Sequence, residues 1–225
     1  MEKKSFECGG KKAAVYCAVQ ADAPLIVLNS FTEDGTAVIR SLQELSAPEC
    51  NLLIISNLNW DRDLSPWYCP PLIENDASFA GGADEYLDLL LAQILPKAKA
   101  MLVGTPCFTG IAGYSLAGLF ALYAIYHCGA FERAASMSGS LWFPGFREYV
   151  QSHEPLKHPD KLYFSLGDRE AKTRNPYLKN VQQDTEQIVS CFQRKGLNVA
   201  WELNPGNHFK DADFRSAKGI KALLE

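Results

Sequence analysis

Short apolar runs alternate along this chain with longer segments in which apolar residues recur at helical spacing. The continuous runs, bounded by polar or turn residues, are typical of strands that are covered on both faces. They predict strands at 13–20, 24–30, 51–58, 108–114, 133–140, 161–167 and 198–204. The segments between them predict helices at 36–45, from about Asp84 to a stop at Pro96, and at 116–129, 176–195 and 211–224.

Strands that alternate with helices favour an α/β fold with a mostly parallel central sheet and helices on both faces. The chain of 225 residues is long enough for one sizeable core and contains no internal repeat or linker. We therefore expect residues 1–225 to form a single domain. Ligands of such sheets bind beyond the carboxyl ends of the strands, so candidate site residues are sought there.

Charge and terminal composition narrow the classes of partner. The 22 basic and 26 acidic residues give a formal net charge of −4, and no basic run is long enough to follow a phosphate backbone. The N-terminal residues MEKKSFECGGKK are charged, and glycines and a serine interrupt the apolar stretch 108–126. We expect no nucleic-acid partner, no signal peptide, no membrane anchor and a cytoplasmic location.

The seven cysteines are scattered, with no C-x-x-C pair and no histidine at zinc-binding spacing. Reduced and mostly buried thiols are expected, as in an intracellular protein. The sequence indicates no metal and no other cofactor.

The segment 60–82 has no regular period because prolines and glycines interrupt it. Irregular loops of this length often have functional roles. We expect this segment to form a wall of the site.

The candidate nucleophile is Ser115, in the sequence GIAGYSLAGL at 110–119. Residues 113–117 match the G-x-S-x-G nucleophile elbow except at the last position, where Ala117 replaces glycine. The match falls where a predicted strand ends and a predicted helix begins, which is the context that the motif requires. The alternative is a tight turn, or a helix start with Ser115 as its N-cap.

A serine hydroxyl attacks esters poorly unless a base takes its proton, and this chain has four histidines. His208, in the turn LNPGNHF, follows the last predicted strand at the carboxyl edge of the sheet. His127 is assigned to a helix end, and His153 and His158 to a charged connection. His208 is therefore the candidate base.

The third member should be an acid between serine and histidine in the chain. The sequence LGDRE, directly after the strand 161–167, supplies Asp168 and Glu170. Such an acid fixes the imidazole tautomer and stabilises the imidazolium. We prefer Glu170, because a G-x-x-acid turn lets its side chain point back over the sheet edge, and Asp168 is the alternative.

An oxyanion hole for the developing negative charge requires two backbone NH donors. The elbow offers the NH of Leu116, the residue after the nucleophile. The second donor is expected in the loop after the strand 24–30, at Ser30 or Phe31.

Taken together, these residues resemble the Putative esterase family of α/β-hydrolases, which includes esterase D, the enterochelin and related siderophore esterases, and the mycolyl transferases. The resemblance spans nearly the whole chain and rests on the segments GYSLAGL, RDLSPW, FAGGADEYL, SGSLWF, LGDRE and GNHF. It implies a compact α/β-hydrolase fold without a large lid. It also implies that Trp67 and Trp142 line the substrate cleft, although composition alone favours core positions for isolated tryptophans at least as strongly. Tyr114, beside the nucleophile, is expected to bind substrate with them.

The family resemblance implies a serine esterase that works through an acyl-enzyme on a small acyl ester or a siderophore-type ester. The substrate is then a small molecule. An acyltransferase or a thioesterase would use the same three residues. A catalytically silent binding protein is the remaining alternative, and it would be favoured if His208 lay far from Ser115.

Overall fold

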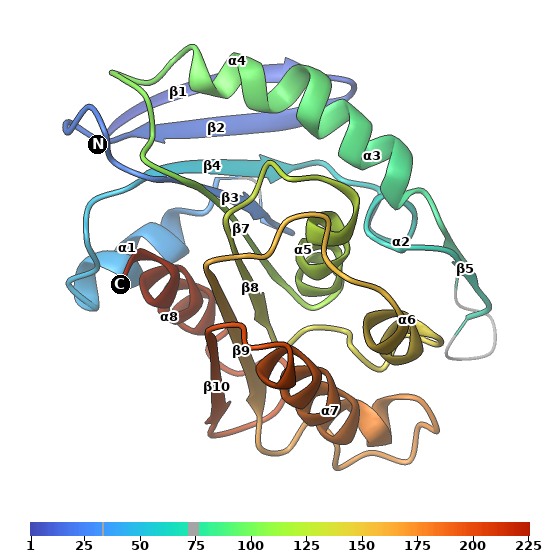
Figure 1. Cartoon of the computed structure of the whole chain (residues 1–225). Helices are drawn as coiled ribbons and strands as arrows, with labels where there is room; N and C mark the ends of the chain where they lie inside the picture. The colour runs from blue at the N-terminus through green and yellow to red at the C-terminus, as the bar shows by residue number, and fades with distance from the viewer. Residues whose placement is uncertain (33, 72–76) are drawn as a thin grey trace.

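A single sheet of eight strands runs through the molecule (Figure 1). The computed structural model describes residues 1–32, 34–71 and 77–225. The strands are Glu2–Cys8 (β1), Lys11–Cys17 (β2), Leu25–Asn29 (β3), Asn51–Ser56 (β4), Thr109–Tyr114 (β7), Arg133–Met137 (β8), Lys161–Gly167 (β9) and Val199–Asn204 (β10). They lie side by side in the order β1-β2-β4-β3-β7-β8-β9-β10.

The sheet is mostly parallel, as predicted. From β4 to β10 every pair of neighbouring strands is parallel, whereas β2 is antiparallel to β4 and β1 is antiparallel to β2. The hydrophobic pattern does not predict β1. Its sequence EKKSFEC contains four charged residues and no continuous apolar run. That composition suits a strand at the sheet edge, where charged side chains discourage pairing with other chains.

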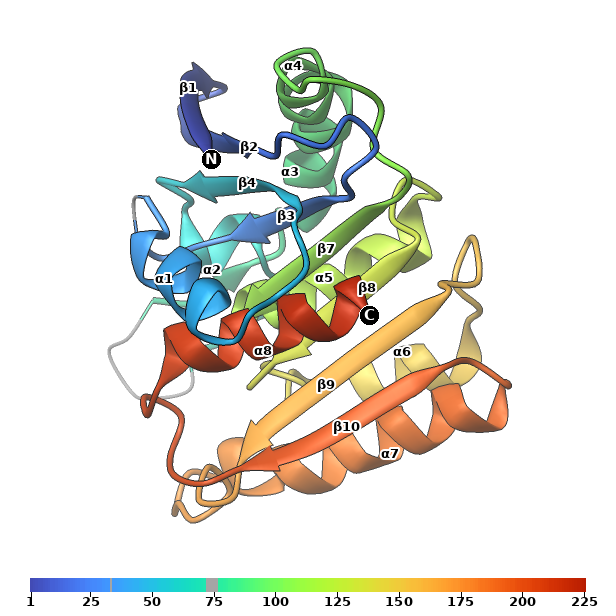
Figure 2. The same cartoon turned by 90° about the vertical axis from the view of Figure 1, so that its left-hand side faces the viewer.

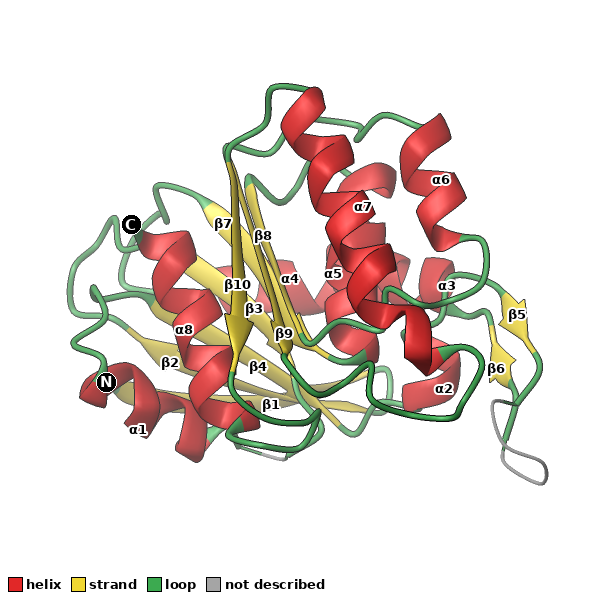
Figure 3. Ribbon diagram, turned by 90° about the horizontal axis from the view of Figure 1, so that it is seen from below, coloured by secondary structure: helices red, strands yellow, loops and turns green. Residues whose placement is uncertain are grey.

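Helices cover both faces of the sheet (Figures 2 and 3). On one face, α1 (Thr36–Glu44) packs beside α8 (Ala212–Leu224). The opposite face is covered by α3 (Ala83–Leu89), a π-helical turn η1 (Leu90–Ile94), α4 (Leu95–Lys99), α5 (Leu116–His127), α6 (Phe146–Ser152), a 3₁₀ turn η2 (Leu178–Asn180) and α7 (Val181–Arg194).

Alternating residues of the central strands divide the core into two apolar layers. In β3, Leu25 and Val27 pack with the layer that contains α5, whereas Ile26 and Leu28 pack with the layer that contains α8. All four side chains are buried, as expected for a parallel strand covered on both faces. The carboxyl ends of β3, β7, β9 and β10 are thereby held in fixed positions along one sheet edge.

The helix that was predicted to stop at Pro96 continues to Lys99. The π-helical turn η1 leads into α4, and Pro96 lies in the first turn of α4. A proline is tolerated there because the π-helical turn has already interrupted the regular i to i−4 hydrogen bonds, so the missing NH removes no regular bond. Helix α6 was also not predicted, since only Phe146 and Val150 of its seven residues are buried.

The irregular segment 60–82 contains a single helical turn, α2 (Trp60–Asp63), and two short strands. The strands β5 (Tyr68–Cys69) and β6 (Phe79–Ala80) pair antiparallel outside the main sheet. Residues 72–76 of this segment lie outside the described residues.

Candidate active site

Ser115 occupies a sharp turn between β7 and α5. Its φ of 60° and ψ of −126° are rarely adopted by a residue with a side chain. Two backbone hydrogen bonds hold the turn: the Ser115 amide donates to the carbonyl oxygen of Met137 (3.1 Å), and the Ser140 amide donates to the carbonyl oxygen of Ser115 (3.0 Å). The strained backbone at the carboxyl end of a central strand is the geometry of a nucleophile elbow.

Small residues around Ser115 are required by close backbone contacts. A Cβ atom at Gly113 would lie 2.1 Å from the carbonyl oxygen of Ala117, and one at Gly118 would lie 2.9 Å from the carbonyl oxygen of Gly113. Ala117 itself is fully buried. The site therefore accommodates alanine at 117, the position where the motif usually has glycine, but needs glycine at 113 and 118.

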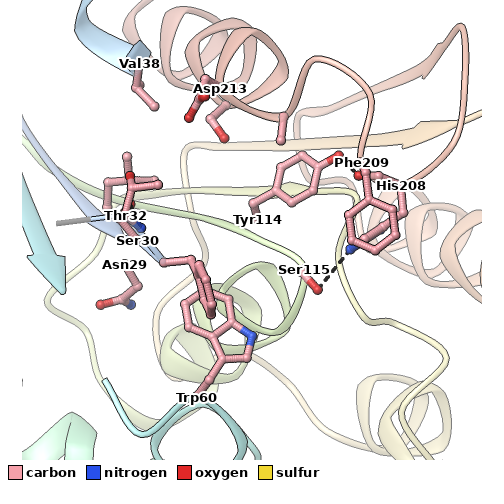
Figure 4. Close-up of a pocket in the computed structure, with 14 residues that line it drawn as sticks. Asn29, Ser30, Thr32, Val38, Trp60, Tyr114, Ser115, His208, Phe209 and Asp213 are labelled. Carbon is pink, nitrogen blue, oxygen red and sulfur yellow. Dashed lines mark hydrogen bonds between the residues drawn. The ribbon is translucent and has the colours of Figure 1, made fainter. Parts of the chain in front are cut away.

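His208, in the loop after β10, lies between Ser115 and Glu170. Its Nε2 is 3.1 Å from Ser115 Oγ, and its Nδ1 is 2.7 Å from Glu170 Oε2 (the first contact is dashed in Figure 4). A carboxylate only accepts hydrogen bonds, so the ring proton belongs on Nδ1, and Nε2 is left to accept the serine proton. The wide separation that would favour a silent binding protein is therefore absent.

Glu170 follows β9 and is almost completely buried, with a side chain 4% exposed. Its Oε1 accepts hydrogen bonds from the Gly167 amide (2.6 Å) and the Ser138 hydroxyl (2.7 Å). Burial acts to raise the pKa of Glu170, but the hydrogen bond and charge of His208, together with the Ser138 and Gly167 bonds, lower it below its ordinary value. The carboxylate is thus held ionised beside His208.

Asp168, the alternative acid, faces a different partner. Its side chain is half exposed, and its Oδ1 accepts a hydrogen bond from the Gly206 amide at 2.7 Å. This contact ties the turn after β9 to the loop that contains His208. Of the two candidate acids, Glu170 is the one that contacts His208.

Behind Glu170 lies Arg215 of α8, a buried arginine with a side chain 2% exposed. Its Nη1 donates to three oxygens, each at 3.3 Å: Glu170 Oε1, Ser138 Oγ and Tyr114 OH. Its Nη2 donates to the carbonyl oxygen of Pro205 at 3.1 Å. Arg215 therefore links the acid, the elbow and the histidine loop.

Tyr114 completes this network on the side of the elbow. Its hydroxyl donates to the carbonyl oxygen of His208 at 2.6 Å. Burial raises the pKa of Tyr114, so the hydroxyl keeps the proton that it donates. Arg215 was not predicted as a site residue, although one sequence signal marks it: it shares the apolar face of α8 with Gly219 and Leu223, four and eight residues further on.

A pocket of about 460 Å³ opens in front of Ser115 (Figure 4). Its walls come from β3 and the loop after it, from α1 and α2, from the elbow, and from the loop between β10 and α8 together with the start of α8. Four aromatic residues line it: Phe31, Trp60, Tyr114 and Phe209. Phe31 and Phe209 are 82% and 86% exposed, so they stand at its mouth.

The predicted oxyanion donors differ in whether their amides are free. The Leu116 amide opens α5, so no residue within the helix can accept from it. The Ser30 amide already donates to the Ile55 carbonyl oxygen at 2.8 Å. Of the two candidates for the second donor, Ser30 is therefore engaged in the β3–β4 pairing, and Phe31 is the next amide along the loop.

Trp67 and Trp142 are not among the residues that line this pocket. The Trp67 indole NH donates to the Pro144 carbonyl oxygen (2.9 Å), and its ring packs near Phe146. The Trp142 ring packs near Phe79. Both indoles are half-buried and pack against the apolar core, so neither lines this pocket as expected, whereas Tyr114 does line it. Within the described part of the segment 60–82, Trp60 alone reaches the pocket.

The other three histidines have separate partners. His127 contacts Tyr149, His153 contacts Ser152, and His158 lies 3.9 Å from the carboxylate of Glu154. In the described part of the chain, no three His, Cys, Asp or Glu side chains gather in a way that could hold a metal ion. The seven cysteines are unpaired, and six are buried, as predicted. No helix in the described ranges is long and apolar enough to cross a bilayer.

Comparison with known proteins places these features in a family. Residues 29–215 match the model of the family described as Putative esterase. A protein of Bacillus subtilis (strain 168), the uncharacterized protein YbbA, is 23% identical over 178 residues, which are 74% of this chain and 71% of that protein.

Solved structures resemble the whole chain. An IroE-like serine hydrolase from Shewanella oneidensis superposes with a TM-score of 0.82 at 18% identity, over 99% of this chain and 80% of its own. The siderophore hydrolase EstB from Aspergillus nidulans gives a TM-score of 0.77 at 17% identity, over 100% of this chain and 95% of its own.

The fold of this chain and the similar solved structures define an α/β-hydrolase fold, as predicted. Within that class, the chain belongs to the Putative esterase family, whose model covers most of its length. It is accordingly a carboxylic ester hydrolase.

Proposed function

We propose that this esterase works through a Ser115–His208–Glu170 triad and an acyl-enzyme intermediate. The observation that carries the proposal is the pair of contacts on His208, 3.1 Å to Ser115 Oγ and 2.7 Å to Glu170 Oε2. One imidazole can then accept the serine proton while its cationic form is stabilised by a buried carboxylate. The continuous sheet from β1 to β10 supports the further proposal that residues 1–225 act as one domain.

In the first half of the proposed reaction, His208 Nε2 takes the proton of Ser115 Oγ as the oxygen attacks the ester carbonyl. The resulting oxyanion is stabilised by the Leu116 amide and by the Phe31 amide, since the Ser30 amide is engaged by Ile55. The C–O bond to the alcohol breaks, the alcohol leaves with the proton from His208, and the acyl group remains on Ser115.

In the second half, His208 takes a proton from water, and the hydroxide oxygen attacks the acyl carbonyl. The bond to Ser115 Oγ breaks, Ser115 recovers a proton from His208, and the carboxylic acid leaves. The exposed aromatic residues at the mouth suggest a small substrate that enters from solvent. Because one similar structure, EstB, is named a siderophore hydrolase, a siderophore-type ester is one candidate substrate.

The test compares wild type, Ser115→Ala and Ser140→Ala with para-nitrophenyl butyrate. Ser140 is a matched control because its hydroxyl lies 3.4 Å from Ser115 Oγ but does not contact His208. We expect Ser115→Ala to lower kcat/KM by at least about a thousandfold, Ser140→Ala to change it little, and wild type to release a stoichiometric burst of nitrophenol. Hydrolysis that persists in purified Ser115→Ala would refute the mechanism. Added alcohols or thiols that divert the acyl group would identify a transferase.

A further inference from the structure

We propose that the substrate of this pocket carries a positive charge and that Asp213 binds it. The inference rests on the proposed function, because it assigns the substrate class of the same site. It starts from Asp213, which lies in the first turn of α8 and lines the pocket that opens at Ser115. In Figure 4 its side chain lies beside Val38, across the pocket from Trp60.

Asp213 is partly buried and has no hydrogen bond or ion pair with any of the residues that the structure describes. A carboxylate that is partly removed from water is stabilised when a cation or a hydrogen-bond donor reaches it. Acidic groups elsewhere on this sheet edge have such partners, as Glu170 does with His208 and Arg215. Asp213 is left to interact with whatever fills the pocket.

The described lining of the pocket contains no lysine and no arginine. The basic residues of α8 closest in sequence to Asp213 are engaged elsewhere: Arg215 contacts Glu170, and Lys218 contacts Asn204. The pocket therefore offers no fixed cation to an anionic substrate, and Asp213 repels one. This charge pattern disfavours esters that carry carboxylate or other anionic groups.

The remaining walls suit a cation as well. The aromatic side chains Phe31, Trp60, Tyr114 and Phe209 face the same space as Asp213. The Phe31 and Trp60 rings meet edge to face with centroids 5.5 Å apart. Aromatic faces attract ammonium groups, and a carboxylate among them adds a full opposite charge. The chemical class indicated is an ester with an alkylammonium group.

Asp213 could also act only on the structure, because a carboxylate in the first turn stabilises a helix by interacting with the positive end of its dipole. Asp211, the N-cap of α8, separates the two roles. It places a carboxylate at the same end of the same helix, but it is exposed and does not line the pocket. Its φ of 54° is readily adopted by asparagine, so Asp211→Asn is a matched control.

The experiment uses three para-nitrophenyl esters with acyl chains of equal length. One ends in trimethylammonium, one in the neutral tert-butyl isostere and one in carboxylate. A second series carries the same three groups on the alcohol portion, so that either half of the substrate can reach Asp213. We expect wild type to prefer the cationic ester in kcat/KM and to disfavour the anionic one. Asp213→Asn should lower the cationic-to-anionic ratio by about tenfold or more, whereas Asp211→Asn should preserve it.

Binding gives a second readout that does not depend on turnover. Calorimetry with Ser115→Ala and the corresponding ethyl esters should give the same order of affinity: cationic, neutral, anionic. Hydrolysis without charge preference, or a preference that survives Asp213→Asn, overturns the inference and leaves the triad standing. Charge-selective binding by a protein that hydrolyses none of the esters overturns the triad and supports Asp213. Equal binding of all three esters by Ser115→Ala overturns the inference whatever the rates are.

Discussion

The two sides of Ser115 are built in opposite ways. Behind His208, the polar groups of Glu170, Ser138 and Arg215 are buried and bonded to one another, and Arg215 also contacts the hydroxyl of Tyr114, whose half-buried ring borders the front pocket. In front of Ser115, the pocket has exposed aromatic rings and a carboxylate without a partner among the described residues. A buried polar group is costly unless it is hydrogen-bonded, so the rear network is fixed before substrate arrives. In front of Ser115, the aromatic rings and the Asp213 carboxylate remain available to interact with a substrate.

This contrast separates reaction from selection. The rear network holds one carboxylate charged and one imidazole in one orientation, which in the proposed mechanism serves any ester. In the same proposal, the front wall decides which ester approaches Ser115. Substitutions behind His208 should therefore lower kcat for every ester, whereas substitutions in front should change the ratio between esters or KM.

The largest effect expected within this contrast comes from Glu170→Gln. The substitution keeps the shape of the side chain but removes the charge that stabilises the His208 imidazolium. We expect kcat to fall about a thousandfold for all esters, as when a triad acid becomes an amide. Asp168→Asn is the control, since Asp168 contacts the Gly206 amide rather than His208. Steady-state kinetics on both variants decides between them, and a larger loss in Asp168→Asn would reverse the assignment of the acid.

The choice between these two acids shows how far sequence could lead. The order of Ser115, LGDRE and His208 in the chain predicted that the three would meet, because parallel strands bring their carboxyl ends to one edge. The alternation of apolar runs predicted the sheet for the same reason. Which of the two carboxylates contacts His208 depends on the backbone of the turn after β9. The sequence offered only the G-x-x-acid spacing to predict that the Glu170 side chain points back over the sheet edge.

Arg215 and Asp213 show what sequence did not reveal. Both lie on α8, and their roles depend on how this helix packs against β7, β8 and β9, contacts between elements far apart in the chain that no local pattern encodes. Trp67 and Trp142 illustrate the converse. Their motifs matched the family, but their half-buried rings pack against the core, where the apolar surface that they remove from water stabilises the fold.

The next largest effect is expected from Arg215→Met. Methionine fills the space but leaves Glu170 without its buried cation, which commonly costs about 3 kcal/mol of folding free energy. We also expect kcat to fall about thirtyfold with KM little changed, because the histidine loop loses its link to the acid. Urea unfolding and steady-state kinetics measure the two effects.

Two variants test whether Arg215 acts by positioning rather than by general stability. Arg215→Lys keeps the charge and should recover part of kcat, and Arg194→Met, at an exposed position that ends α7, should change neither quantity. If Arg215→Met lost stability yet kept wild-type kcat below its unfolding transition, the rear network would be structural only.

The smallest effect is expected from Phe209→Ala at the pocket mouth. Phe209 is 86% exposed, so its ring has little to contribute to folding and only part of one face to offer a substrate. We expect KM for a neutral aromatic ester to rise about threefold while kcat stays constant, which is the signature of lost uniform binding. Phe214→Ala, a neighbouring phenylalanine outside the pocket lining, is the control. A fall in kcat instead would mean that Phe209 helps to orient His208, its neighbour in the chain, and the division between a reacting rear and a selecting front would not hold at this residue.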